Sequence, residues 1–266
     1  MTTHSDPAEA LRTLGLRAST DAIRALLAHA TKSSLSPAQL CLELTTLERR
    51  ERDARNLAAR TKAAVLGTPK SLDRFDWSHP RAIDRVLYEE LHDSLGFIER
   101  GENVLLRGQA GAGKTTLAKH LGFAALAKGH SVRFTTLAGA LADLLRQQTL
   151  PAVERRLRRY TAPDLLICDE LGYVPCDSDA ADLLFRIVTE RHEQRSVVIT
   201  TNLAYKQWGT VFGDAPCLVP LVDRFAQHCH VLDIDADSWR DKERLEKKSV
   251  LSPKKGADQR RLAARR

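Results

Sequence analysis

Cysteine is scarce in this sequence, and its spacing argues against a disulfide scaffold. The chain has five cysteines in 266 residues, an odd number, and none of them forms a CxxC pair. Disulfide-dense secreted domains carry even sets of closely spaced cysteines. We therefore expect reduced thiols in a cytoplasmic protein at Cys41, Cys168, Cys176, Cys217 and Cys229.

Long apolar segments are also missing, so we expect no membrane-spanning helix. No apolar run approaches the ~18 residues of a membrane span, and the first residues lack the apolar core of a signal peptide. Aromatic residues make up only 5% of the chain, but a hydrophobic content of 43% is enough for a globular core. The length allows one domain with its own core and a smaller appendage.

A general excess of positive charge is absent as well, although the net charge is +7. Residues 247–266 contain eight Lys/Arg and one Asp, so the preceding chain balances at 33 positive against 33 negative residues. The excess positive charge therefore comes from these last twenty residues, and we expect residues 249–266 to form a basic tail. Such a tail could contact phosphate backbones or could be a solvated, disordered end.

What the sequence does contain is a phosphate-binding loop. The spacing Gly108-x-x-x-x-Gly113-Lys114-Thr115 is that of a P-loop, in which small residues let backbone N–H groups close around phosphates. Lys114 would place its charge on the β- and γ-phosphates, and the Thr115 hydroxyl would ligate Mg²⁺. The predicted ATP-binding residues are Gly108, Gln109, Ala110, Gly111, Ala112, Gly113, Lys114, Thr115 and Thr116.

The flanks of this loop favour nucleotide binding over a structural glycine-rich turn. Residues 104–106 predict a short buried strand, and residues 116–127 predict a helix whose N-terminus faces the phosphates. Strand, loop and helix in this order are the context that the motif requires.

Two adjacent carboxylates follow a second apolar stretch. Residues 165–168 predict a central strand, and Asp169 and Glu170 come at its C-terminal end, where open α/β sheets bind ligands. Asp169 suits Mg²⁺ binding through water, and Glu170 suits activation of an attacking water. Asn202 ends the next predicted strand, residues 196–202, where it could contact the γ-phosphate, orient the water or cap a turn.

The first 66 residues predict a separate helical domain. Helices are expected over 7–14, over 21–29 with Thr20 as N-cap, and from Pro37 with Ser36 as its cap. The last of these becomes strongly charged over 48–62. Its cations could lie on a solvated, ion-paired face or could contact the DNA backbone, the candidates being Arg49, Arg50, Arg52 and Arg55.

After a break at residues 67–69, strands and helices alternate, which predicts a parallel sheet covered on both faces. An extended lead-in over 71–77 would turn Phe75 and Trp77 to one side, either beside the adenine or onto the core. Further helices are expected over 80–95, 137–148 and 151–160, and further strands over 130–136 and 230–234. The helix over 151–160 offers a second set of DNA-contact candidates, or an exposed or subunit-contact face, in Arg155, Arg156, Arg158 and Arg159.

In order along the chain, these motifs resemble the AAA+ ATPases of the initiator and helicase-loader group, and more narrowly the IstB family of transposition helper ATPases. The resemblance extends from the N-terminal helices to about residue 248. Beyond the P-loop it is carried by residues 71–76, 97–104, 164–173 and 237–240. It implies an α/β AAA+ core over 67–248, an N-terminal helical domain over 1–66, and no C-terminal lid domain.

The resemblance also implies roles that spacing does not. Arg224 corresponds to an arginine finger that reaches the γ-phosphate on a neighbouring subunit, and Arg240 corresponds to a sensor arginine acting in its own chain. The family usually has tyrosine where Trp239 stands and often proline or threonine at Gln109 and Ala112. These departures leave ATP use intact.

For function, the resemblance implies a Mg²⁺-dependent ATPase that oligomerises on duplex DNA, remodels it, and assists the transposase of the same element. The alternatives are a loader of a replicative helicase, a small-molecule kinase and a nucleotide-binding module without hydrolysis. The adjacent Asp169 and Glu170 and the strand end at Asn202 suit water activation better than phosphoryl transfer to a small acceptor.

Overall fold

The computed structural model describes residues 6–68, 75–173, 177–213, 215–239, 241–242 and 244. These residues form two compact units, divided between Ala63 and Ala64, three residues before the boundary predicted from the sequence. The expected basic tail, residues 249–266, lies outside the described residues. None of the helices in the described part of the chain is both long and apolar enough to cross a bilayer.

The first unit is helical. It consists of α1 (Pro7–Thr13), α2 (Thr20–Lys32) and most of α3 (Pro37–Ala64). Ser36 caps α3, exchanging hydrogen bonds with Gln39. The predicted cap of α2 was wrong by one residue: the hydroxyl of Ser19 accepts from Ala22 N–H, and Thr20 is the first residue inside the helix. Both residue types suit this position, so sequence alone does not choose between them.

A small apolar cluster holds this unit together. Ala8, Ala18 and Ile23 are fully buried, and Leu44 and Leu47 of α3 pack against them. The Glu48 carboxylate, one residue further along α3, accepts hydrogen bonds from the backbone N–H groups of Arg17 and Ala18, both at 2.8 Å. These bonds hold the pKa of Glu48 below its usual value despite the opposing effect of desolvation.

The second unit is built on a five-stranded sheet in which every strand pair is parallel, with the order β2-β3-β4-β1-β5. The strands are β1 (Asn103–Gly108), β2 (Val132–Thr136), β3 (Leu165–Leu171), β4 (Ser196–Thr201) and β5 (Cys229–Ile234). The predicted parallel sheet is confirmed. Its order places β4 between the strand that leads into the P-loop and the strand that carries Asp169.

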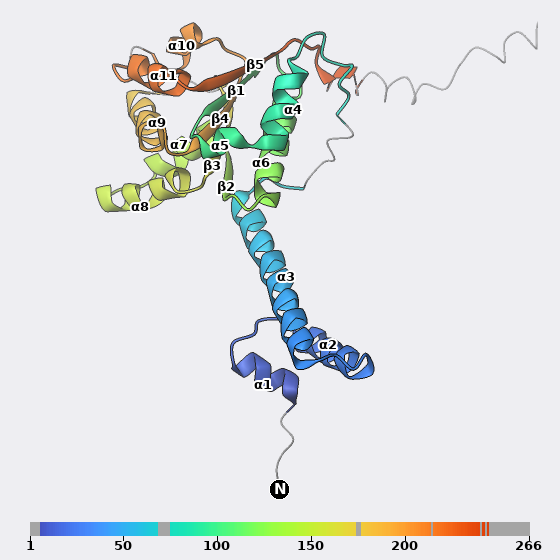
Figure 1. Ribbon diagram of the computed structural model, residues 1–266. Helices are drawn as coiled ribbons and strands as arrows, with labels where there is room; N and C mark the ends of the chain where they lie inside the picture. The colour runs from blue at the N-terminus through green and yellow to red at the C-terminus, as the bar shows by residue number, and fades with distance from the viewer. Residues whose placement is uncertain are drawn as a thin grey trace, which may run out of the picture. The chain divides into compact units, whose positions relative to one another are not determined.

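Helices cover both faces of this sheet (Figure 1). One face is packed by α4 (Arg85–Ser94), α5 (Gly96–Glu99) and α6 (Lys114–Ala127). The other face is packed by α7 (Leu137–Leu145), α8 (Leu150–Thr161), α9 (Ser178–Arg191), α10 (Gly209–Phe212) and α11 (Leu218–Ala226), with a short 3₁₀ helix at Tyr205–Gln207. In the part of the chain that the structure describes, no helical lid domain follows β5.

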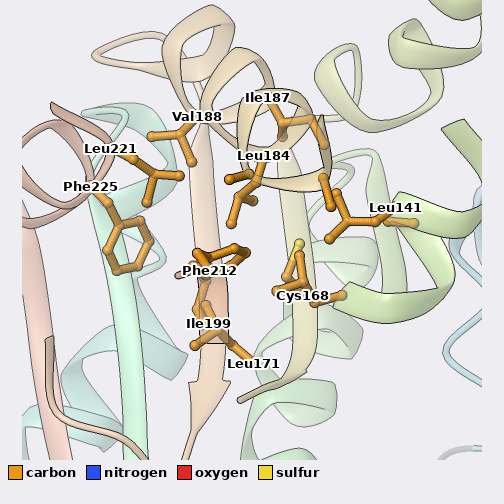
Figure 2. Close-up of a cluster of buried hydrophobic side chains, with 14 of the residues drawn as sticks. Leu141, Cys168, Leu171, Leu184, Ile187, Val188, Ile199, Phe212, Leu221 and Phe225 are labelled. Atoms are coloured by element: carbon orange, nitrogen blue, oxygen red, sulfur yellow. The ribbon is translucent and has the colours of Figure 1, made fainter. Parts of the chain in front are cut away.

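Alternating side chains of the central strands supply both cores. Cys168 on β3 and Ile199 on β4 face the α7–α11 side, whereas Ile167 and Val198 face the α6 side. Figure 2 shows the first of these clusters, in which Leu184 of α9 lies over Cys168 and Ile199. Burial raises the pKa of the Cys168 thiol to about 12, so this neighbour of Asp169 stays uncharged.

The segment before α4 differs from the prediction. Residues 80–84 are not helical; the backbone N–H groups of Arg81 and Ala82 donate to Asp235 O, and Asp84 caps the helix that begins at Arg85. Residues 75–79 are likewise a turn and not an extended segment, because Asp76 accepts from both the backbone N–H and the hydroxyl of Ser78. Residues 71–74 of the expected lead-in lie outside the described residues.

Candidate active site

The P-loop joins β1 to α6 and forms a cradle of backbone groups. Gly111 and Gly113 have φ values of +83° and +90°, which side chains rarely adopt. A Cβ at Gly113 would also lie 2.7 Å from the ring of Phe75. Gly113 is the N-cap of α6 and provides no side-chain cap to its first turn. The first backbone N–H groups of α6 therefore suit phosphate oxygens.

Lys114 lies inside this loop. Its side chain is buried, and its Nζ donates to the carbonyl oxygens of Gly108 and Gln109, both at 2.7 Å. These two bonds hold the ammonium charge at the base of the cradle, where the β- and γ-phosphates of a nucleotide would lie. The predicted role of Lys114 is compatible with this position.

Thr115 in the first turn of α6 contacts Asp169 on β3, although 54 residues separate them. The Thr115 hydroxyl donates to Asp169 Oδ1 at 2.9 Å, and Asp169 is 3% exposed. A carboxylate and a hydroxyl beside a phosphate cradle are oxygen donors of the kind that Mg²⁺ uses together with waters and phosphates. Within the described residues, no cluster of three or more His, Cys, Asp or Glu side chains could hold a metal ion. A metal ion here would therefore need waters and phosphate oxygens as further ligands. The donor set therefore fits Mg²⁺.

Glu170 occupies a β-bulge. Cys168 pairs with Ile199 and Leu171 pairs with Thr201, so two residues of β3 face the single residue Thr200 of β4. Glu170 has φ +66°, and its side chain is exposed. A left-handed conformation at a non-glycine residue costs about 1–3 kcal/mol and is concentrated at functional sites. The bulge turns Asp169 inward and leaves the Glu170 carboxylate accessible to water.

Thr200 is a residue of this site that the sequence did not identify. Its hydroxyl donates to Asp169 Oδ1 at 2.5 Å and accepts from the backbone N–H of Glu170 at 3.0 Å. The only signal in the sequence was a pair of threonines at the end of an apolar strand. Asn202 follows β4 and is exposed, at the edge where the P-loop and Asp169 lie.

Two further segments pack against the P-loop. Ser238 lies against Gly111, whose carbonyl accepts from the backbone N–H of Trp239 at 3.2 Å. The rings of Phe75 and Trp77 contact each other at 4.8 Å and pack on the α6-side core. The core-packing alternative for these two aromatics is thus observed. Arg240, the expected sensor arginine, lies outside the described residues.

Arg224 lies on α11 and contacts α9. Its Nη1 donates to the hydroxyl of Thr189 at 2.7 Å, and its guanidinium lies 4.8 Å from the centre of the Phe185 ring. Both contacts hold the side chain in place, and the residue is only partly exposed. Of the predicted catalytic residues, Lys114, Glu170 and Asn202 therefore lie at the P-loop edge of the sheet, whereas Arg224 is anchored on a helix pair.

The predicted DNA-contact residues of α3 are exposed, and some of them form ion pairs. Arg52 and Arg55 each lie 3.6 Å from Glu48 Oε1, and Arg55 also donates to Arg17 O. Arg49 and Arg50 are exposed, and among the described residues neither has an ion pair.

The four candidate arginines of α8 likewise include two that form ion pairs and two that do not. Asp143 on α7 lies 3.4 Å from Arg156 and 4.0 Å from Arg159, so its charge offsets these two. Arg155 and Arg158 are exposed and have no ion pair among the described residues. Of the four predicted candidates on each helix, two are therefore exposed without an ion pair among the described residues.

Comparison with known proteins identifies the family. The sequence profile of the IstB-like ATP binding protein family matches residues 9–247. An ATP-binding protein of insertion sequence IS21 from Pseudomonas aeruginosa is 37% identical over 223 residues, which cover 84% of this chain and 83% of that protein. The corresponding protein of IS5376 from Geobacillus stearothermophilus is 30% identical over 220 residues, covering 83% and 87%.

A solved structure supports the fold assignment. AMPPCP-bound DnaA from Aquifex aeolicus superposes with a TM-score of 0.54 at 19% identity, covering 69% of this chain and 56% of DnaA. At that identity the likeness concerns the fold alone, which is the AAA+ core with helices on both faces of a parallel sheet. A profile match over most of the sequence, with relatives of 30–37% identity across more than four fifths of both chains, shows that this chain belongs to the IstB-like ATP binding proteins and is an AAA+ ATPase of insertion sequences.

Proposed function

We propose that this ATPase assembles as an oligomer on duplex DNA and, by hydrolysing Mg²⁺-ATP, assists the transposase encoded by the same insertion sequence. The observation that carries the catalytic part is the hydrogen bond between Thr115 on the P-loop and Asp169 on β3. It joins the two predicted metal ligands at the edge where the phosphates would bind. Family membership supports the transposition part.

Each residue of the site has a distinct task in this mechanism. The first-turn N–H groups of α6 bind phosphate oxygens, and Lys114 offsets their charge. Thr115 and Asp169 would hold Mg²⁺, which neutralises charge on the β- and γ-phosphates. Glu170 accepts a proton from the attacking water, and Asn202 orients that water or the γ-phosphate. Arg224 of a neighbouring subunit and Arg240 of the same chain stabilise the charge of the transition state.

DNA binding would rest on phosphate contacts from α3 and α8. A protein that neutralises phosphates with Arg and Lys loses affinity with salt by a log–log slope of about −0.9 per phosphate. Such contacts carry no sequence information, so we expect little discrimination between unrelated duplexes.

The uncompensated pair on α8 gives a direct test of the DNA-binding proposal. Changing Arg155 and Arg158 to Ala should weaken duplex binding and reduce the salt slope by up to about 1.8, that is, about 0.9 for each phosphate that is no longer neutralised. The matched control is the double Ala variant of Arg85 and Arg100, which Glu89 and Glu102 pair at 2.7 Å. Equal slopes for both variants and the wild type, measured by fluorescence anisotropy, would exclude α8 from the interface.

The role in transposition is tested with the transposase of the same insertion sequence. Purified transposase, donor DNA and this protein should give more strand-transfer products with ATP than without the protein. The Glu170→Gln variant distinguishes hydrolysis from binding in the same reaction. A replicative helicase loader would instead leave strand transfer unchanged and bind the host helicase.

A further inference from the structure

A single buried hydroxyl connects the two carboxylates of the site. Thr200 is 1% exposed. Its Oγ1 donates to Asp169 Oδ1 at 2.5 Å and accepts from the backbone N–H of Glu170 at 3.0 Å. A hydroxyl has one donor and two acceptor positions, so it can make both bonds at once. The proposed metal ligand and the proposed water-activating residue are thus tied to the same atom.

The bulge explains why a side chain is needed at this point. Across a regular parallel ladder, N–H groups donate to backbone carbonyl groups of the neighbouring strand. Between Cys168 and Leu171 the register shifts, and two residues of β3 face only Thr200. At this shift the Glu170 N–H donates to the Thr200 hydroxyl. This bond holds Glu170 in its left-handed conformation with φ +66°.

The same hydroxyl orients Asp169. Thr115 and Thr200 donate to one oxygen of this carboxylate, from the P-loop side and from the β4 side respectively. Two donors on Oδ1 fix the rotation of the carboxyl group. An orientation fixed before ligand binding lowers the reorganisation that catalysis would otherwise require.

We infer that Thr200 is a positioning residue for ATP hydrolysis, which sets the geometry of Asp169 and Glu170 through its hydroxyl. The inference rests on the roles proposed above for those two residues. Loss of the Thr200 hydroxyl should leave the affinity for nucleotide in the absence of Mg²⁺ unchanged, since no part of the P-loop backbone is changed. It should reduce both the metal-dependent gain in affinity and the rate of hydrolysis.

The test compares Thr200→Val and Thr200→Ser with a neighbouring control. Valine keeps the shape and removes the hydroxyl, whereas serine keeps the hydroxyl and removes the methyl group. Thr201→Val is the matched control, because Thr201 is equally buried and its hydroxyl bonds to Leu171 O and Leu203 N–H, away from both carboxylates. Thermal unfolding establishes that each variant is folded.

Two quantities are measured for each variant. The first is kcat for ATP hydrolysis, which should fall by about 10–100-fold in Thr200→Val and by less than about threefold in Thr200→Ser and Thr201→Val. The second is the calorimetric affinity for AMPPNP with and without Mg²⁺. Thr200→Val should bind the analogue in EDTA like the wild type and gain less affinity than the wild type when Mg²⁺ is added.

Three results would overturn the inference. One is a wild-type kcat and Mg²⁺ response in Thr200→Val, and another is an equal loss in Thr201→Val, which would indicate a general effect of core hydroxyl groups. If Thr200→Val does not fold, Thr200→Ser is the test variant, and a tenfold loss of turnover in Thr200→Ser would contradict a role for the hydroxyl.

Glu170→Gln is measured in parallel, to separate this inference from the proposed function. If Glu170→Gln keeps full turnover, the role proposed for Glu170 is wrong. If Glu170→Gln loses turnover and Thr200→Val does not, only the role of Thr200 is refuted.

Discussion

Replacing Arg191 with Met should destabilise the second unit strongly while leaving the P-loop intact. Arg191 is fully buried at the end of α9. Its guanidinium donates to five carbonyl oxygens, which belong to the end of α8, the loop before β3 and the start of β4. They are those of Tyr160 at 2.9 Å, Thr161 at 3.2 Å, Pro163 at 2.8 Å, Asp164 at 3.0 Å and Ser196 at 2.7 Å.

The expected loss follows from two opposing contributions. Hydrogen bonds from a charged donor contribute about 1.5–3 kcal/mol each, and five of them exceed about 7 kcal/mol if added. Burial opposes this gain and lowers the pKa of Arg191 to about 9 from 12.5, which corresponds to about 5 kcal/mol. These two contributions alone differ by only about 2 kcal/mol. Methionine would also leave the five buried carbonyl oxygens without their guanidinium donor, so we expect a net loss of about 3–5 kcal/mol in the free energy of unfolding.

Urea denaturation followed by tryptophan fluorescence and circular dichroism measures this loss. The matched control is Arg195→Met, four residues further on, because Arg195 is partly exposed and, among the described residues, its side chain has a single hydrogen bond, to Thr161 O at 3.3 Å. We expect less than about 1 kcal/mol for this control. Equal losses in the two variants, or a loss below about 1 kcal/mol in Arg191→Met, would refute the view that the five bonds outweigh the burial of the charge.

Three further predictions concern the site and its surroundings. Lys114→Ala should lose nearly all ATP binding in calorimetry, because the charge at the base of the cradle is gone, whereas Lys128→Ala at the far end of α6 should bind normally. Arg224→Ala should bind ATP but hydrolyse it ~10³–10⁵-fold more slowly, and mixing it with Lys114→Ala should restore turnover if the finger acts between subunits; no recovery in co-assembled mixtures would show that Arg224 does not act in trans. Glu102→Gln should lose about 1–2 kcal/mol of stability at pH 7, since Arg100 and then His230 hold the pKa of Glu102 at about 2, below its ordinary 4.5. That contribution is present above pH 4.5 and disappears as the pH falls toward 2, so urea midpoints of variant and wild type should converge on acidification, and a constant gap would contradict the assignment.

Local sequence patterns were sufficient to predict much of this fold. Apolar runs of β-length alternating with helical periodicity predicted a parallel sheet, and glycine spacing with Lys114 and Thr115 predicted the phosphate cradle. The motifs predicted Thr115 and Asp169 as ligands of one metal ion, and their side chains lie within hydrogen-bond distance, at 2.9 Å; metal binding itself stays a prediction. These features depend on residues close in sequence or on the rule that ligands bind at the carboxyl ends of parallel strands.

Features that depend on distant partners could not be predicted in this way. The order of the strands is set by packing of the whole sheet, so the position of β4 between β1 and β3 was not evident. Residues 80–84 were expected to be helical, but Arg81 and Ala82 pair with Asp235, about 150 residues away. The bulge at Glu170 and the role of Thr200 require a register shift between two strands, which neither strand encodes alone.

The bulge at Glu170 also creates a conflict between the stability of the fold and the activity of the site. Leu166 and Cys168 face the α7–α11 core, so strict alternation would send residue 170 into the same apolar cluster. The extra residue changes the parity of the strand, and the buried Leu171 fills that place. An acid therefore occupies a backbone conformation that glycine would adopt without strain. Selection for stability alone would favour glycine at this position, whereas turnover would select for a carboxylate at a cost in folding.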